Sequence, residues 1–169
     1  MHIYNRSTPR RRIWSVRINW SRELTFSERQ ISYISQYVPK ERGVYCIYAK
    51  NRVFSHWDNE LGRARWSPVV YIGCGWIRSR LCSHLKHKKN DLLAEFLDNH
   101  NLGYRYDRID DSDPEWDWPR VVEAGLLRIY LERFGSLPPA NRREETFPEL
   151  DLHGFLVDES DNFSVMRRR

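Results

Sequence analysis

The sequence predicts an α+β fold, in which helices flank a small sheet of three strands. Residues 43–49 and 68–73 are short runs of β-branched and aromatic residues, which is typical of buried strands. A third strand is expected at residues 102–108, where the apolar and aromatic residues Leu102, Tyr104 and Tyr106 occupy every second position. Helices are expected at residues 76–87, 91–99 and 118–134. A chain of 169 residues suits one domain, residues 1–169, with a real core.

Residues 1–42 are expected to add an arm, a strand and a helix to this core. Residues 1–12 are basic and polar, which is typical both of a frayed terminus and of an arm that contacts nucleic acid. Residues 14–20 alternate between apolar and polar side chains, which predicts a half-buried strand. Ser27 can cap a following helix, Phe26 can pack on Ile31, and Pro39 ends the helix.

A long connection, residues 50–67, separates the first two core strands and is expected to be a loop. It carries basic residues interleaved with tryptophans: Lys50, Arg52, Trp57, Arg63, Arg65 and Trp66. That combination suits a surface that binds nucleic acid. A loop that folds back and covers the sheet with its tryptophans would have the same composition, so both interpretations remain.

The segment 73–75 is a glycine-rich turn that leads into the helix at 76–87. Helical spacing predicts a core face formed by Ile77, Leu81 and Leu85. A second stripe carries Arg80, His84 and His87, and it should lie near the tyrosines of the two strands, Tyr45 and Tyr71. His87 by itself is typical of an exposed helix position.

Two acidic or amide residues are expected to begin the later helices. Asn90 can cap the helix at 91–99. The acidic stretch 107–117 could be read as a metal cluster, but it better fits a solvated loop that ends in Asp113 or Asp117 as the next N-cap. After the helix at 118–134, Gly135 is a suitable C-cap, and residues 138–141 turn the chain back. The C-terminal residues 142–169 suggest a peripheral strand or hairpin.

Glu123 is the most informative single residue of the helix at 118–134. This helix is apolar on most sides, so it should be buried, and Glu123 shares a stripe with Leu127, Tyr130 and Phe134. A buried carboxylate needs a nearby cation, because an unpaired one costs several kcal/mol. The cation could be Arg80 in a structural salt bridge or a bound metal ion, and burial alone does not decide between them.

Composition narrows the class of partner. The net charge of +5 favours a polyanion, although a merely basic protein would show it as well. Three cysteines without a CxxC spacing argue against a disulfide framework and against a zinc site. No apolar run approaches the roughly 20 residues of a membrane span, and no signal peptide is evident. We therefore expect an intracellular protein of the cytoplasm or nucleoid, with no membrane partner.

These residues, in this order, resemble the GIY-YIG nuclease superfamily. The resemblance runs from Gly43 to Asn141. It rests on Gly43-Val44-Tyr45, Tyr71-Ile72-Gly73, Arg80 with His84, Asn90, Glu123 and Asn141. It implies an α/β sandwich with a mainly antiparallel sheet, in which residues 43–141 form the nuclease core and residues 1–42 and 142–169 are extensions. It also implies a metal-dependent endonuclease that hydrolyses phosphodiester bonds of DNA.

The resemblance implies a role for each matched residue. Glu123 would bind Mg²⁺ or Mn²⁺, and Arg80 would hold the phosphate from the other side. Tyr71, with Tyr45 or His84, would orient and deprotonate the water. Asn141 would support the glutamate or the sheet edge, with Asn90 as a further supporting residue. Candidate nucleic-acid contacts are Lys50, Arg52, Arg63, Arg65, Arg78 and Lys86.

Some features depart from the family pattern, and other functions stay open. Cys74 stands where some members carry a lysine, and the turn from Gly73 to Arg80 is a residue shorter than in the excision-repair members.

A catalytically silent nucleic-acid-binding module on the same fold is the main alternative, and a basic α/β domain with a chance match is the third. The intact set of Tyr45, Tyr71, Arg80 and Glu123 favours the enzyme.

Overall fold

The computed structural model describes residues 3–8, 11–58, 63–88, 90–110, 116–142 and 150–153. Its centre is a four-stranded antiparallel sheet with the order β3-β8-β4-β7. The strands are β3 (Leu24–Phe26), β4 (Arg42–Ala49), β7 (Val69–Trp76) and β8 (Leu102–Arg108). This confirms a mixed α+β fold, but the sheet has four strands where the sequence predicted three. The extra strand, β3, is only three residues long, and Phe26 belongs to it.

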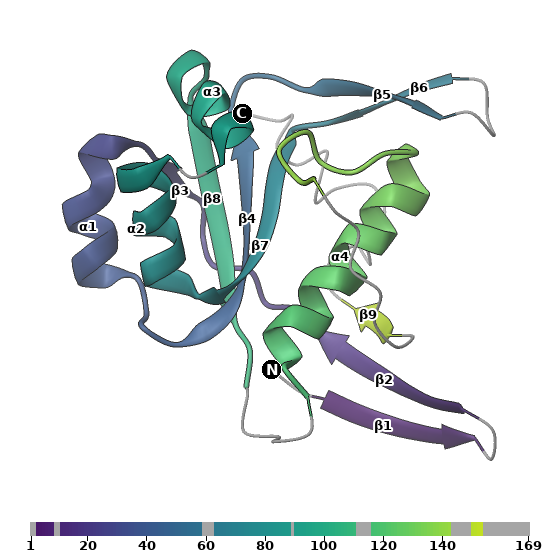
Figure 1. Ribbon diagram of the computed structural model, residues 1–169. Helices are drawn as coiled ribbons and strands as arrows, with labels where there is room; N and C mark the ends of the chain where they lie inside the picture. The colour runs from purple at the N-terminus through teal and green to yellow at the C-terminus, as the bar shows by residue number, and fades with distance from the viewer. Residues whose placement is uncertain are drawn as a thin grey trace.

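Helices cover both faces of this sheet (Figure 1). One face carries α1 (Ile31–Tyr37), α2 (Ile77–His87) and α3 (Asp91–Asn99), and the other carries α4 (Trp118–Phe134). The predicted bounds of the last three agree with the structure within a residue. No helix in the described ranges is long and apolar enough to cross a membrane.

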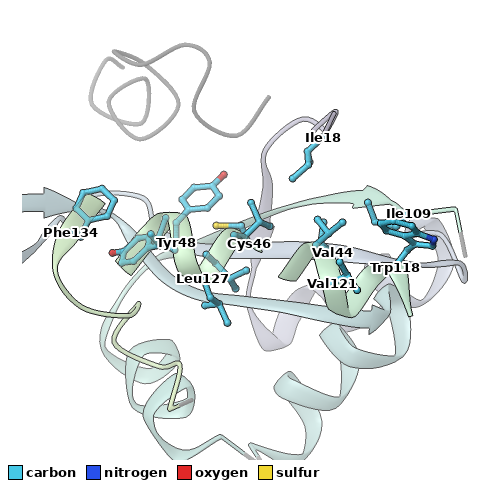
Figure 2. Close-up of a cluster of buried hydrophobic side chains, with 14 residues drawn as sticks. Ile18, Val44, Cys46, Tyr48, Ile109, Trp118, Val121, Leu127 and Phe134 are labelled. Carbon is cyan, nitrogen blue, oxygen red and sulfur yellow. The ribbon is translucent and has the colours of Figure 1, made fainter. Parts of the chain in front are cut away.

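The alternation of side chains along β4 creates two cores. Val44, Cys46 and Tyr48 point to α4 and pack with residues of that helix, including Val121 and Leu127, as Figure 2 shows. The neighbouring residues of β4, Tyr45, Ile47 and Ala49, point to the opposite face and pack with α2, α3 and β8. All six are at most 5% exposed, so β4 is buried on both faces. This central strand therefore anchors both layers.

Caps bound the two later helices as expected. The Asn90 side chain accepts a hydrogen bond from the backbone N–H of Leu93 at the start of α3. At the start of α4, the Asp117 side chain accepts a hydrogen bond from the backbone N–H of Arg120. At its end, the C-cap residue Gly135 has a φ of 74°. The left-handed φ favours glycine there. Asp113 lies outside the described residues.

Two predictions about the periphery were wrong, and a third was right except for its bounds. The N-terminal arm contains a strand, β1 (Ile3–Thr8), and the strand predicted at 14–20 is present three residues earlier as β2 (Arg11–Arg17). Both belong to a separate sheet with β9 (Leu150–His153), which pairs with β2 in parallel. The predicted loop at 50–67 contains an antiparallel hairpin, β5 (Phe54–Asp58) and β6 (Arg63–Ser67). Local patterns miss such strands because their stability comes from pairing partners.

The predicted cap of the N-terminal helix was also wrong. Ser27 makes no side-chain capping hydrogen bond, and the segment begins with the 3-10 turn η1 (Glu28–Gln30) before α1. The helix ends at Tyr37, two residues before Pro39, as the proline predicted.

Candidate active site

Two tyrosines meet on one face of the sheet, on adjacent strands. Tyr45 on β4 is paired in register with Gly73 on β7, and Tyr71 is paired with Ile47. The two rings lie with centroids 6.1 Å apart. A Cβ at position 73 would lie 2.5 Å from the Tyr45 hydroxyl oxygen and 2.6 Å from the Tyr71 ring. Glycine is therefore needed at position 73 for the rings to occupy this space.

Helix α2 places His84 against both tyrosines. Its core residues Ile77, Leu81 and Leu85 are buried against the sheet, which turns His84 toward the sheet surface beside them. The Nε2 atom of His84 lies 2.8 Å from the Tyr45 hydroxyl, and its ring stands edge-on to Tyr71 with centroids 5.2 Å apart. The hydrogen-bond partner of His84 is therefore Tyr45, and Tyr71 contacts His84 through its ring.

The electrostatics of the cluster keep its groups neutral near pH 7. Burial, and then the charge of Arg80, lower the pKa of His84 to about 4. Burial raises the pKa of Tyr71, and the Glu123 carboxylate raises it further, whereas Arg80 opposes the change. Burial is also the main reason for the raised pKa of Tyr45. A neutral imidazole beside two neutral phenols can relay a proton in either direction.

Arg80 approaches the same cluster from α2, one helical turn before His84. Its side chain is exposed, as a group that binds an incoming anion must be. Gly75, with a φ of 114°, lies beside it, and a Cβ there would lie 3.5 Å from Cγ of Arg80. This φ is one that residues other than glycine rarely adopt. The turn at Gly75 therefore sets the start of α2 and, with it, the place of Arg80.

Glu123 comes to the site from the other face of the sheet. It lies on α4, is half-buried, and accepts a hydrogen bond of 2.9 Å from the Cys74 thiol through Oε2. Cys74 is on β7, which is the last strand of the sheet order. The Glu123 carboxylate contributes to the raised pKa of both Tyr71 and Tyr45. Nothing in the sequence pattern indicated the contact between Cys74 and Glu123.

The Asn141 side chain pairs with the backbone of β7 at the end of the sheet order. Its side-chain oxygen accepts from the Ile72 backbone N–H at 2.9 Å, and its side-chain nitrogen donates to the Ile72 carbonyl at 2.8 Å. The amide thus satisfies the strand as a neighbouring strand would. Asn90 donates to the carbonyl of Ala140 at 2.9 Å, which holds the same turn from the side of α3. Of the two supporting roles open to Asn141, the contacts match the sheet edge.

Two of the candidate nucleic-acid residues, Lys50 and Arg78, make contacts within the chain. Lys50 donates to Thr25 at 2.9 Å and pairs with Glu23 at 3.5 Å. Arg78 donates from Nε to the Val38 carbonyl, which fastens α2 to the end of α1. These contacts use both side chains within the chain.

The remaining candidates are spread over the surface. The Arg52 guanidinium lies 5.9 Å from the Phe54 ring centroid. Arg65 is half-buried on β6, and Lys86 is exposed at the end of α2. The side chains of Arg63 and Trp57 lie outside the described residues. The hairpin is therefore not a single basic surface in the part of the chain that the structure describes.

The donor set at Glu123 suits a hard divalent ion with few protein ligands. Within the described ranges, no group of three or more His, Cys, Asp and Glu side chains could hold a metal. Mg²⁺ is usually held by one or two carboxylates and keeps several waters. Glu123 supplies one carboxylate at the edge of the tyrosine cluster, so it is the residue that could hold Mg²⁺ or Mn²⁺ here.

Comparisons with family models, with curated proteins and with solved structures gave no match to this chain.

Proposed function

We propose that this protein is a metal-dependent endonuclease of the GIY-YIG type that hydrolyses DNA phosphodiester bonds. The observation that carries the proposal is the arrangement of Tyr45, Tyr71 and His84 around Gly73, with Arg80 and Glu123 beside it. Hydrolysis of a phosphodiester needs an activated water, stabilisation of the phosphoryl oxygens and help for the leaving oxygen. The cluster contains a side chain for each need.

Arg80 would bind the non-bridging oxygens of the scissile phosphate, since a guanidinium fork matches phosphate geometry. Glu123 would hold Mg²⁺ or Mn²⁺. The ion, when bound, supplies positive charge for the phosphate and for the leaving 3′ oxygen. The exposure of Arg80 and the half-burial of Glu123 allow both to reach a strand that lies over the β7 edge.

Tyr71 would position the attacking water. As the water oxygen bonds to phosphorus and the bond to the 3′ oxygen breaks, the Tyr45 hydroxyl would take the water proton while it passes its own proton to Nε2 of His84, with which it shares a hydrogen bond. A phosphate next to Arg80 offsets the cation that lowers the pKa of His84, so substrate makes the imidazole a better base.

The test is incubation with supercoiled plasmid in Mg²⁺ and, separately, in Mn²⁺, followed by mapping of the cut ends. Nicked or linear products that disappear in EDTA support the proposal. Intact plasmid in both ions overturns it. If such a protein still retards DNA in a gel, the catalytically silent binding module is the function.

A further inference from the structure

A hydrogen bond between Cys74 and Glu123 joins the last strand of the sheet to the helix that covers it. Cys74 lies on β7, at the end of the sheet order, and Glu123 lies on α4. The Cys74 thiol donates to Oε2 of Glu123 at 2.9 Å, and both side chains are half-buried. The contact therefore brings a donor to the carboxylate that could hold the metal ion.

The position of Cys74 on β7 lets it reach this carboxylate from the face opposite the tyrosine cluster. Successive side chains of a strand point to opposite faces of the sheet. Tyr71 packs with the core on the side of α2, whereas Cys74 packs with the core that α4 covers (Figure 1). The thiol is thus on the same face as Glu123, while its strand also carries Tyr71.

The backbones on both sides of the contact are fixed by other residues. On α4, the neighbours of Glu123, Val122 and Ala124, are buried. On β7, Cys74 is paired in antiparallel register with Val44 of β4. What is left to orient is the long side chain of Glu123, which loses rotamer freedom when its carboxylate is held. A hydrogen bond to that carboxylate fixes its orientation relative to the sheet.

We propose that Cys74 is a positioning residue of the metal site, whose thiol holds the Glu123 carboxylate in the orientation that binds a divalent ion. The inference rests on the proposed function, in which Glu123 holds Mg²⁺ or Mn²⁺. Residues that hydrogen-bond to a metal ligand orient it, and their loss typically weakens metal binding ~10–100-fold. A carboxylate has about four lone-pair sites, so one donor leaves others for the ion.

Donation by the thiol differs from ligation of the ion by the sulfur. Mg²⁺ and Mn²⁺ are suited by oxygen ligands, whereas thiolates select softer ions such as Zn²⁺. A thiol that donates to a carboxylate carries its proton, whereas a sulfur ligand has lost it. Serine at position 74 separates the two roles, because its hydroxyl can donate the same hydrogen bond but supplies no sulfur.

The experiment measures Mn²⁺ binding to the full chain without DNA, from the EPR signal of free Mn²⁺. Cys74→Ala removes the donor, and Cys74→Ser replaces the thiol with a hydroxyl. Cys46→Ala is the matched control, because it makes the same deletion at a buried position of β4 in the same core. Glu123→Gln removes the carboxylate itself. Circular dichroism establishes that each variant is folded.

We expect Cys74→Ala to raise the Kd of Mn²⁺ at least about tenfold. Cys74→Ser and Cys46→Ala should bind Mn²⁺ about as tightly as wild type, and Glu123→Gln should lose most of the affinity. The inference is overturned if Cys74→Ala binds Mn²⁺ like wild type, or if Cys74→Ser or Cys46→Ala loses as much affinity as Cys74→Ala. It is also overturned if Glu123→Gln keeps the wild-type affinity.

These results are separate from the test of the nuclease itself. Mn²⁺ binding is measured without DNA, so intact plasmid overturns the proposed function while the Mn²⁺ affinities still decide the role of Cys74. In an active enzyme, Cys74→Ala should cut more slowly than wild type at limiting Mn²⁺ and recover at saturating Mn²⁺, because the defect lies in holding the ion. A defect that does not shrink as Mn²⁺ is raised overturns the inference and leaves the nuclease standing.

Discussion

Two histidines in this protein have the same kind of partner in different surroundings. Nε2 of His84 lies 2.8 Å from the Tyr45 hydroxyl, and Nε2 of His56 lies 2.9 Å from the Tyr130 hydroxyl. Burial lowers the pKa of both imidazoles. Arg80 lowers the pKa of His84 further, whereas burial is the cause of the shift at His56.

The contacts of His56 indicate that it has a structural role. It is 7% exposed, and its second ring nitrogen, Nδ1, lies 2.6 Å from the Ser136 hydroxyl. Its ring also packs on Phe134, with centroids 5.6 Å apart, so it ties β5 to the end of α4. The comparison teaches that a hydrogen-bonded histidine and tyrosine are not by themselves a catalytic pair. At His84 the neighbouring groups are Tyr71 and Arg80, and the proposed mechanism rests on these together with Glu123.

The largest effect should come from Glu123→Gln. The amide is nearly isosteric but a poor Mg²⁺ ligand. We expect plasmid cleavage to fall at least about a thousandfold while DNA binding in EDTA persists. His56→Gln, assayed under conditions in which it is folded, should cut at the wild-type rate. A Glu123→Gln protein that cuts as fast as wild type in Mg²⁺ would remove this residue from the mechanism.

Arg80→Ala should have the next largest effect. Loss of the guanidinium removes stabilisation of the phosphoryl oxygens in the transition state, so we expect a drop of about 100-fold in single-turnover rate. The matched control is Arg108→Ala. Arg108 is also exposed, and its ion pair with Glu41 is long, at 4.0 Å. Equal losses in the two variants would indicate a general charge effect in place of a specific contact.

Removal of single proton-transfer groups should have a smaller effect. Tyr71→Phe keeps the packing and removes only the hydroxyl, and His84→Ala removes the imidazole. Each should lower the single-turnover rate at least about tenfold, the usual range for acid–base groups. Tyr130→Phe makes the same change at the His56 pair and should leave the rate unaltered. An unchanged rate and pH profile in Tyr71→Phe would leave His84 as the base.

Much of this arrangement could be predicted from local patterns, because the residues that build it lie on elements with strong periodicity. The apolar runs of β4 and β7 and the buried stripe of α2 place Tyr45, Tyr71 and His84. The caps Asn90 and Asp117 were recognisable because their side chains act on backbone groups three residues away.

The remainder depends on partners that are distant in sequence. The parallel pairing of β2 with β9 joins residues more than 130 positions apart, and no local pattern reports it. The contact of Cys74 with Glu123 joins two layers of the fold. The hairpin β5–β6 was predicted as a long loop, because its two strands are stabilised by pairing with each other and not by a strong pattern of their own.

The smallest expected effect concerns the pH dependence of stability, to which both histidines contribute. The pKa of His84 is lowered in the folded state, from an ordinary value of about 6.5 to about 4. Between these values the unfolded chain binds more protons than the folded one. The stability associated with a neutral His84 is therefore complete above about pH 6.5 and is lost as the pH falls toward 4.

For His84 this loss should amount to roughly 2 kcal/mol after allowance for its partial exposure. Urea unfolding at about pH 7.5 and about pH 5 measures it, with wild type compared with His84→Gln and His56→Gln. Each variant should lose less stability between the two pH values than wild type, because each lacks one of the imidazoles. Only His84→Gln should at the same time lower the cleavage rate at about pH 7.5. If His84→Gln loses as much stability as wild type on acidification, His84 is protonated in the folded state and the neutral relay through Tyr45 is wrong.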